Sequence, residues 1–145
     1  MQIVNAFDHR EKAMALLEGE KLPVNDLTHN LDNLVVALQN GEVAGTAGLE
    51  IYGNYGLLRS LAVGSIYRGQ GVAARLLGYL EEFAASREIE EIYLLTETAA
   101  DYFRNKGYHQ IARAEVPVEV QQSSEFSFVC PQSAVVMRKM LTVNK

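Results

Sequence analysis

The chain has 145 residues, 48% of them hydrophobic, and its 13 basic and 18 acidic side chains give a formal net charge of −5. This length allows one ordinary domain with a buried core and is too short for two full-sized ones. The acidic balance without a basic stripe disfavours nucleic acid as a partner, and no apolar run reaches the about 18 to 20 residues that span a bilayer.

Cysteine and histidine usage and the start of the chain bear on its compartment. Cys130 is the only cysteine, and the three histidines are scattered, so we expect neither an internal disulfide nor a metal site. Residues 1–5 have no basic patch followed by an apolar stretch, and they do not read as a signal peptide. These features predict a cytoplasmic protein.

The first half of the chain predicts one helix and several strands. Capping-box spacing between Asp8 and Glu11, followed by apolar residues at helical spacing, indicates a helix that ends near Gly19. Asn40-Gly41 is a hairpin signal. The expected strands cover residues 2–6, 34–38, 42–52 and 57–63, with a polar loop containing a helical turn over 21–33 and a turn over 53–56.

The second half alternates helices and strands. Apolar residues at helical spacing predict a helix from Val72 to about Arg87. The later expected elements are a strand over 92–95, a helix over 98–106 and strands over 108–112 and 134–141. Residues 115–132 lack a clear period and form either a functional loop or a short helix. This order predicts a single domain over residues 1–145, of the α+β or mixed α/β class, with a central sheet.

Residues 68–73, between the fourth expected strand and the long helix, have the character of an anion cradle. The free N–H groups and the dipole of a helical first turn attract negative charge. Gly69 and Gly71 let a phosphate approach the backbone, and Arg68 adds a positive charge. The alternative is a structural turn with an exposed arginine.

Two common phosphate-binding motifs fit this segment poorly. A nucleoside-triphosphate loop needs Lys-Ser or Lys-Thr after its glycines, whereas Val72 and Ala73 follow Gly71. The spacing Gly69-x-Gly71-x-x-Ala74 satisfies a dinucleotide fingerprint, with Glu97 after the next strand. That fold normally begins with its fingerprint strand and needs more strand–helix units, so this second interpretation is disfavoured without being excluded.

Two spaced motifs resemble the GNAT superfamily of acetyl-CoA-dependent N-acetyltransferases. Arg68-x-x-Gly71-x-Ala73 is similar to the family's Arg/Gln-x-x-Gly-x-Gly/Ala bend, and residues 61–63 are similar to the strand end before it. The segment 99–108 resembles the family's Ala-x-x-x-Tyr-x-x-x-Gly-Phe helix, with Phe103 at the tyrosine position. The order of the motifs also agrees with the family.

This resemblance implies a central, mostly antiparallel sheet of six to seven strands flanked by helices, and acetyl-CoA as the cofactor. It implies that strand backbone groups pair with the pantetheine arm and that N–H groups of the bend hold the pyrophosphate. The residues so assigned to the cofactor are Leu61, Ala62, Val63, Arg68, Gly69, Gln70, Gly71, Val72, Ala73 and Phe103. Residues 57–63, 93–96 and 130–137 further resemble a branch of the family associated with arsenic resistance.

The catalytic groups depart from the family pattern. Many relatives use a tyrosine as the acid, where this chain has Phe103, and Tyr102 is turned away by about 100° on the helix. Thr96 stands where relatives often have asparagine. Backbone N–H groups near Leu61 and Ala62 can polarise the thioester carbonyl without any side chain.

In relatives the base is often a Glu or His on the fourth strand, at the positions that Leu57 and Arg59 occupy here. Neither of these two residues can act as a base. A four-residue turn over 53–56 would pair Tyr52 with Leu57 and therefore Glu50 with Arg59. The catalytic hypothesis is that Glu50 accepts the amine proton while Arg59 orients an anionic acceptor. The alternative is a purely structural ion pair.

The sequence therefore predicts an acetyl-CoA-dependent N-acetyltransferase that acts on a small amine by direct transfer. A homodimer is one assembly that the sequence allows. The alternatives are an acyl-CoA-binding sensor or scaffold of the same fold without efficient catalysis, and a protein or peptide N-acetyltransferase. The acetyl acceptor, and the roles of residues 115–132 and Cys130, stay open.

Overall fold

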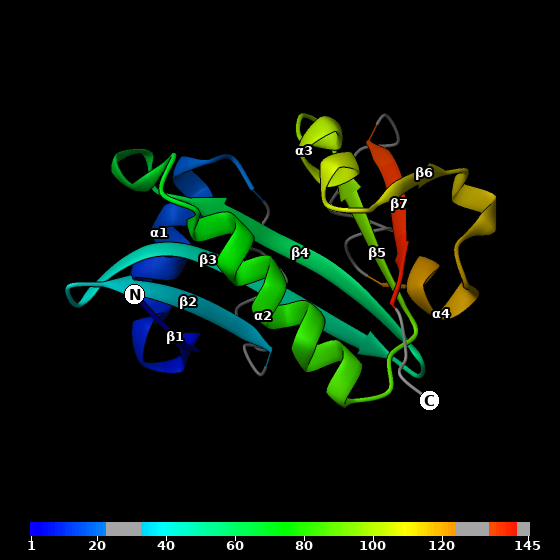
Figure 1. Ribbon diagram of the computed structural model, residues 1–145, viewed down its shortest axis with the longest axis horizontal. Coiled ribbons are helices and arrows are strands. Elements are labelled where there is room, and N and C mark those ends of the chain that lie inside the picture. Colours follow the sequence, from blue (N-terminus) through cyan, green and yellow to red (C-terminus); the bar gives the residue numbers. More distant parts are fainter. Residues whose placement is uncertain (23–32, 124–133, 142–145) are drawn as a thin grey trace. The chain divides into compact units, whose positions relative to one another are not determined.

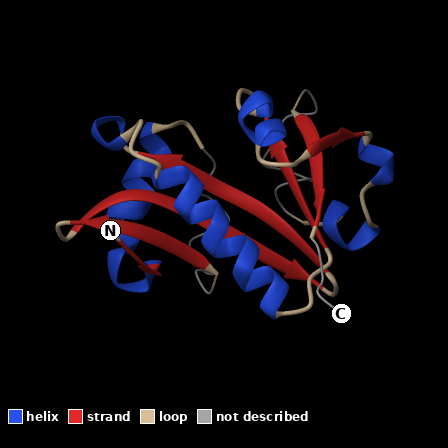
Figure 2. Ribbon diagram, in the orientation of Figure 1, coloured by secondary structure: helices blue, strands red, loops and turns tan. Residues whose placement is uncertain are grey.

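The computed structural model describes residues 1–22, 33–123 and 134–141. The described residues form a seven-stranded sheet. Helices lie between the strands along the chain (Figures 1 and 2), which is the mixed α/β class that the sequence predicts. The strands are β1 (Gln2–Asn5), β2 (Leu34–Gln39), β3 (Glu42–Tyr52), β4 (Tyr55–Val63), β5 (Glu91–Thr96), β6 (His109–Ile111) and β7 (Val135–Met140). The helices are α1 (Arg10–Gly19), α2 (Val72–Ser86), α3 (Ala100–Asn105) and α4 (Val118–Gln121), with 3-10 turns at Ala6–His9, Ser65–Tyr67 and Arg113–Glu115.

The strands form one sheet in the order β1-β2-β3-β4-β5-β7-β6. Antiparallel ladders join β1 to β2, β2 to β3, β5 to β7 and β6 to β7. Strands β4 and β5 are parallel, through Tyr55–Glu91, Gly56–Ile92 and Leu57–Tyr93. The prediction of a mostly antiparallel sheet of six to seven strands is confirmed.

The chain divides into two compact units. The first contains Met1–Leu49 and Arg59–Phe83, and the second contains Glu50–Leu58 and Ala84–Lys145. In the first unit, Ala13 and Leu17 of α1 pack with Leu34 and Val36 of β2. Helix α2 lies across the opposite face of the sheet, and Figure 1 shows this helix in front of β3. Both faces of this part of the sheet are therefore covered by helices.

The closest approach of α2 to the sheet is at Gly45. A Cβ atom added there would lie 2.9 Å from Val72 Cγ1, 3.0 Å from Leu76 Cδ1 and 2.9 Å from the Ala62 carbonyl oxygen. Val72 and Leu76 are buried residues of the first two helical turns, so the absent side chain sets how near the start of α2 lies to β3 and β4.

The start of α1 differs from the prediction. A 3-10 turn over Ala6–His9 precedes the helix, and the Asn5 side chain caps that turn by accepting a hydrogen bond of 2.8 Å from Phe7 N. The N-cap residue of α1 is His9, which makes no capping bond with its side chain. Asp8 lies inside the 3-10 turn, so the predicted box with Glu11 does not form the start of α1. The predicted end at Gly19 is confirmed.

The turn between β3 and β4 is shorter than predicted. Strand β3 ends at Tyr52 and β4 begins at Tyr55, so the turn is formed by Gly53 and Asn54, with Gly53 at φ +63°. A two-residue hairpin shifts the pairing by two residues relative to a four-residue loop. Arg59 accordingly lies beside Gly48, where an added Cβ atom would be 3.7 Å from Arg59 Cγ. The predicted four-residue turn is therefore corrected to two residues, and the contact between Arg59 and Glu50 stays a prediction.

The second unit has its own core, formed by residues of β4, β5, β7 and the segment around α4. The buried members are Leu57, Tyr93, Val116, Val120 and Val136, packed with the partly buried Tyr52, Tyr55, Leu95 and Ile111. Part of the segment 115–132 is thus helical, since α4 contributes Val120 to this core. Residues 124–132 of that segment, with Cys130, and most of the predicted loop over 21–33 lie outside the described residues. No helix in the described ranges is long and apolar enough to cross a membrane.

We expect Gly45→Ala to lower the free energy of unfolding by about 1–3 kcal/mol, because the new methyl group overlaps a backbone oxygen and two packed side chains. Gly78→Ala is the matched control on α2, since Gly78 is exposed and a Cβ atom there meets nothing within 4 Å. It should instead stabilise the helix by about 0.8–1 kcal/mol. Chemical denaturation of both variants measures the difference, and equal effects would contradict the close-packing account.

Candidate functional site

The predicted bend is built as a left-handed turn that leads into α2. Gly69 and Gly71 both have φ +79°, a conformation that favours glycine, and an added Cβ atom at either one meets nothing within 4 Å. The need for glycine here is therefore conformational. The amide of Arg75 donates to the Gly71 carbonyl at 3.1 Å and begins the helical ladder. The amides of the preceding turn have no partner within the helix, which makes this end of α2 an anion-binding geometry.

Side chains of the bend are tied to nearby backbone. Gln70 Nε2 donates to the Ile66 carbonyl at 3.3 Å, and Arg68 Nε donates to the Val63 carbonyl at 3.4 Å. The first contact closes the 3-10 turn before the bend, and the second holds the guanidinium at the end of β4. The predicted cofactor residues 61–63 and 68–73 all lie in the first unit, where the structure brings the strand end and the helix start together.

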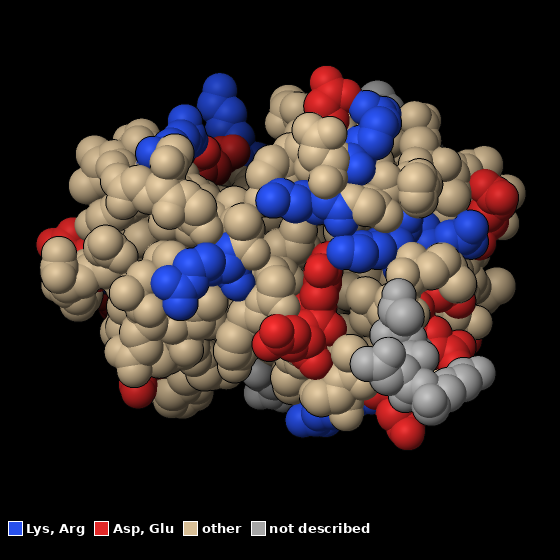
Figure 3. Space-filling view, in the orientation of Figure 1, with Lys and Arg blue, Asp and Glu red and all other residues tan. Residues whose placement is uncertain are grey.

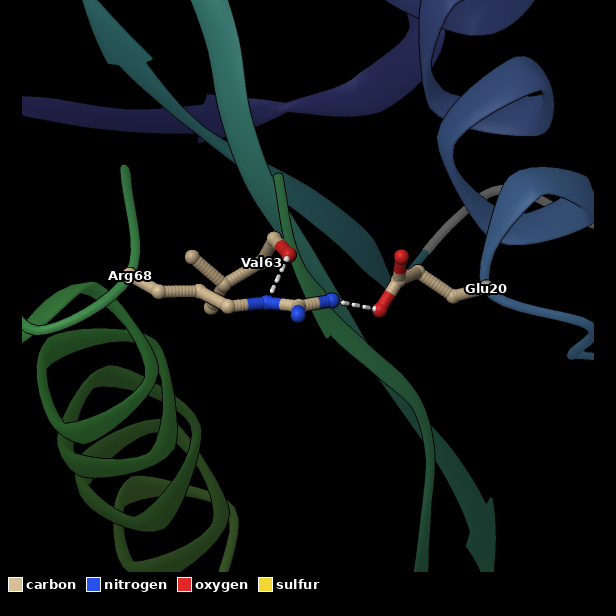
Figure 4. Close-up of polar contacts among 3 residues, drawn as sticks. All are labelled: Glu20, Val63 and Arg68. Atoms are coloured by element: carbon tan, nitrogen blue, oxygen red, sulfur yellow. Dashed lines mark hydrogen bonds and ion pairs between the residues drawn. The ribbon is translucent and has the colours of Figure 1, made fainter. Parts of the chain in front are cut away.

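The charge of Arg68 is already paired. Its terminal nitrogen forms an ion pair with Glu20, one residue beyond α1, and Figure 4 shows the guanidinium between this carboxylate and the Val63 carbonyl. The side chains of Arg68 and Glu20 keep 56% and 31% of their exposure, so an incoming anion can reach the pair. Sequence reasoning missed Glu20, because no local signal relates two residues 48 positions apart.

A second cluster of polar side chains lies in the middle of β4 and on the neighbouring β3. Ser60 has φ +61°, which is uncommon for a residue with a side chain, and it is 9% exposed. The hydroxyl of Thr46 donates to the Ser60 carbonyl at 2.7 Å, and Arg59 Nε donates to Ser60 Oγ at 3.2 Å. Arg59, predicted to be catalytic, is a buried cation with 4% exposure in this group.

The other predicted residues belong to the second unit. Glu50 accepts a hydrogen bond of 2.7 Å from the Tyr52 hydroxyl. Phe103 is 6% exposed, and its ring lies edge-on to Tyr102 and Tyr108, at 5.4 and 5.6 Å between centroids. Thr96 Oγ1 accepts from Ala99 N at 3.0 Å and so satisfies an amide at the start of α3.

A tyrosine and acid cluster in the second unit was not predicted. The Tyr93 hydroxyl donates to Glu91 Oε1 at 2.8 Å, and Arg138 lies 3.9 Å from the same oxygen. Burial, followed by the bond to Glu91, raises the pKa of Tyr93 to about 12. The hydroxyl therefore stays protonated at neutral pH and cannot act as a base.

The charges seen in Figure 3 are not spread evenly. Lys and Arg side chains gather over β5 to β7 and α3, and acidic ones lie nearby. Two lysines of the second unit lie over aromatic rings, Lys139 over Tyr108 and Lys106 over Tyr102, each with Nζ 5.6 Å from the ring centroid. Lys139 Nζ also donates to the Lys106 carbonyl at 3.0 Å. In the described ranges no three His, Cys, Asp or Glu side chains form a metal-binding group.

Comparison with known proteins shows the family to which the chain belongs. The model of the acetyltransferase (GNAT) family matches residues 6–112. The chain belongs to this family. An amino-acid acetyltransferase of Vibrio atlanticus is 28% identical over 97 residues, which are 66% of this chain and 22% of that protein.

Solved structures share the fold. N-acetylglutamate synthase of Neisseria gonorrhoeae, complexed with coenzyme A and N-acetyl-glutamate, superimposes with a TM-score of 0.81 at 18% identity, over 97% of this chain and 35% of that one. Rv2747 of Mycobacterium tuberculosis, in complex with CoA, gives 0.83 at 20% identity, over 98% of this chain and 100% of that one. The chain thus spans only 22% and 35% of the Vibrio and Neisseria proteins.

We expect Glu20→Gln to tighten coenzyme A binding by about 1.5- to 5-fold, because the exposed ion pair that competes for Arg68 is worth about 0.2–1 kcal/mol. Glu18→Gln, which removes the same charge from an exposed position of α1, is the control and should change little. Isothermal titration calorimetry gives both affinities. Weaker binding by Glu20→Gln would mean that the carboxylate orients Arg68 for the ligand instead of competing with it.

Proposed function

We propose that the protein is an acetyl-CoA-dependent N-acetyltransferase that moves an acetyl group directly to the amine of a small molecule. The observation that carries the proposal is the left-handed bend at Gly69 and Gly71, which leaves the amides of the first turn of α2 open beside Arg68. Family membership and the coenzyme A in the Neisseria and Mycobacterium structures support the same cofactor.

In this proposal the bend, Arg68 to Ala73, holds the cofactor's diphosphate, because dipole, amides and guanidinium all favour negative charge there. The backbone of Leu61, Ala62 and Val63 pairs with the pantetheine arm, and Phe103 contributes an apolar contact. The Arg68 guanidinium has to release Glu20 before it can pair with the diphosphate. The backbone amides can bind the diphosphate without giving up another partner.

The transfer is balanced in atoms and electrons. An uncharged amine nitrogen attacks the thioester carbonyl carbon, a C–N bond forms, and the carbonyl oxygen takes the negative charge. The C–S bond then breaks, coenzyme A leaves as a thiolate, and the amine proton passes to a base or water. The thiolate takes up one proton, so the products are an amide and free coenzyme A.

Catalysis without the family's usual tyrosine acid is energetically feasible. A positioned acid contributes about 10²- to 10⁴-fold, whereas bringing two substrates together supplies about 7–11 kcal/mol. Phe103 cannot donate a proton, and its burial against Tyr102 and Tyr108 gives it a packing role. We therefore propose that juxtaposition and carbonyl polarisation provide most of the acceleration.

The acceptor is proposed to be an amino-acid-like amine, with Glu50 as the base and Arg59 as the group that orients its anion. A buried guanidinium is a strong partner for a carboxylate, and the Vibrio and Neisseria proteins are named for amino-acid substrates or products. The narrower likeness to an arsenic-resistance branch adds organoarsenical amines as candidates.

Acetyl-CoA binding and thiol release, measured with a panel of amines, test the function. We expect binding to the intact protein, a loss of affinity with Arg68→Gln, and thiol release with at least one amino-acid-like acceptor. Binding without release for small amines and peptides alike would favour the acyl-CoA sensor, and release with peptides alone would favour a peptide N-acetyltransferase. Failure to bind acetyl-CoA would overturn the proposal.

Glu50→Gln tests the base. Turnover should fall most at low pH, where most of the acceptor amine is protonated and a base is needed most. Glu119→Gln, at an exposed position of α4, removes the same charge and should leave the pH–rate profile unchanged. A Glu50→Gln profile parallel to that of the wild type would remove Glu50 from the mechanism.

A further inference from the structure

A buried hydrogen bond joins a side chain of β3 to the backbone of β4 in the first unit. Thr46 is fully buried, and its hydroxyl lies 2.7 Å from the Ser60 carbonyl oxygen that accepts its proton. Thr46 faces the side of the sheet opposite to Gly45 and α2, because neighbouring residues of a strand alternate. Thr46 thus binds the Ser60 carbonyl from the face of the sheet that is opposite to α2.

This contact fixes the direction of the next amide. The Ser60 carbonyl and the Leu61 N–H belong to one trans peptide unit, in which the two groups point in opposite directions. With the carbonyl bound to Thr46, the Leu61 N–H is directed away from Thr46. The ladder from β4 to β5 covers Tyr55 to Leu57, so Leu61 lies four residues beyond it.

The conformation of Ser60 also requires support. A left-handed residue that is not glycine costs about 1–2 kcal/mol, and it persists only where its surroundings over-determine it. Two side chains provide that support, since Thr46 binds the carbonyl and Arg59 binds the hydroxyl of the same residue. The strained backbone at this residue is held by two buried contacts and lies two residues before Ala62, the buried residue of the proposed pantetheine segment. This combination is a reason to seek a function for the peptide.

We infer that Thr46 is a positioning residue: its hydroxyl holds the Ser60–Leu61 peptide so that the Leu61 N–H meets the acyl carbonyl oxygen of the bound thioester. The inference rests on the proposed function. During transfer that oxygen gains negative charge as the C–N bond forms and loses it as the C–S bond breaks. A fixed N–H donor lowers the barrier because it stabilises this charge without reorganising.

The test compares Thr46→Val with Thr46→Ser. Valine keeps the shape and removes the hydroxyl, whereas serine keeps the hydroxyl that binds Ser60. We expect Thr46→Val to lower kcat by about 10- to 100-fold, less than the about 10²- to 10³-fold that follows direct removal of an oxyanion donor. The Kd for acetyl-CoA should be unchanged, since the bend is not altered, and Thr46→Ser should restore kcat.

The infrared band of the bound thioester provides a readout that packing alone does not move. With acetyl-CoA labelled by carbon-13 at the carbonyl, binding to the wild type should shift the band to lower wavenumber. The shift should be lost in Thr46→Val and kept in Thr46→Ser. A retained shift with wild-type kcat in Thr46→Val would overturn the inference, as would a loss in both variants.

The same data separate this inference from the proposed function. Wild-type protein that does not bind acetyl-CoA contradicts the function itself, whereas binding with a shift insensitive to Thr46 contradicts only the role of Thr46. If Thr46→Val does not fold, Thr46→Cys takes its place, because a thiol is a weaker donor of similar size. An intermediate shift and intermediate kcat would then support the inference, and wild-type values would refute it.

Discussion

The close approach of α2 to β3 at Gly45 is the constraint on which the candidate site depends. A Cβ atom at residue 45 would lie within 3.0 Å of Val72, Leu76 and the Ala62 carbonyl oxygen of β4, so the absence of a side chain allows this close approach. The start of the helix is thereby held next to the end of the strand that leads into it. An anion cradle made of backbone amides works only at a fixed place, since the amides cannot reorient as side chains do.

The contacts of Arg68 change what the cradle is expected to do. An arginine beside a glycine-rich bend suggests a free positive charge, yet here the guanidinium is shared between Glu20 and the Val63 carbonyl. The chain's net charge of −5 adds no long-range attraction for an anion. In the proposed function, recognition of a diphosphate at this place would therefore rely first on the amides of the left-handed turn, and the arginine would act by exchanging one carboxylate for another anion.

Local patterns predicted most elements of the fold, because helical spacing, the Asn40-Gly41 turn and the glycines of the bend act over a few residues. The predicted turn between β3 and β4 was too long for a local reason as well: Gly56 resembled part of the turn but belongs to β4. The partners Glu20 and Thr46 could not be predicted, since they come from positions 48 and 14 residues away and are selected only by packing.

Left-handed backbone occurs at two places in the candidate site, with a different residue type at each. At the bend, glycine adopts a left-handed conformation at little cost, and the open space beside it admits a ligand. In β4 the left-handed residue is Ser60, which costs more but brings a hydroxyl that Arg59 binds. Glycine at position 60 would relieve the strain and lose that contact. The serine thus ties the buried guanidinium to the same peptide that Thr46 orients, so one segment links the acceptor-binding and acyl-binding proposals.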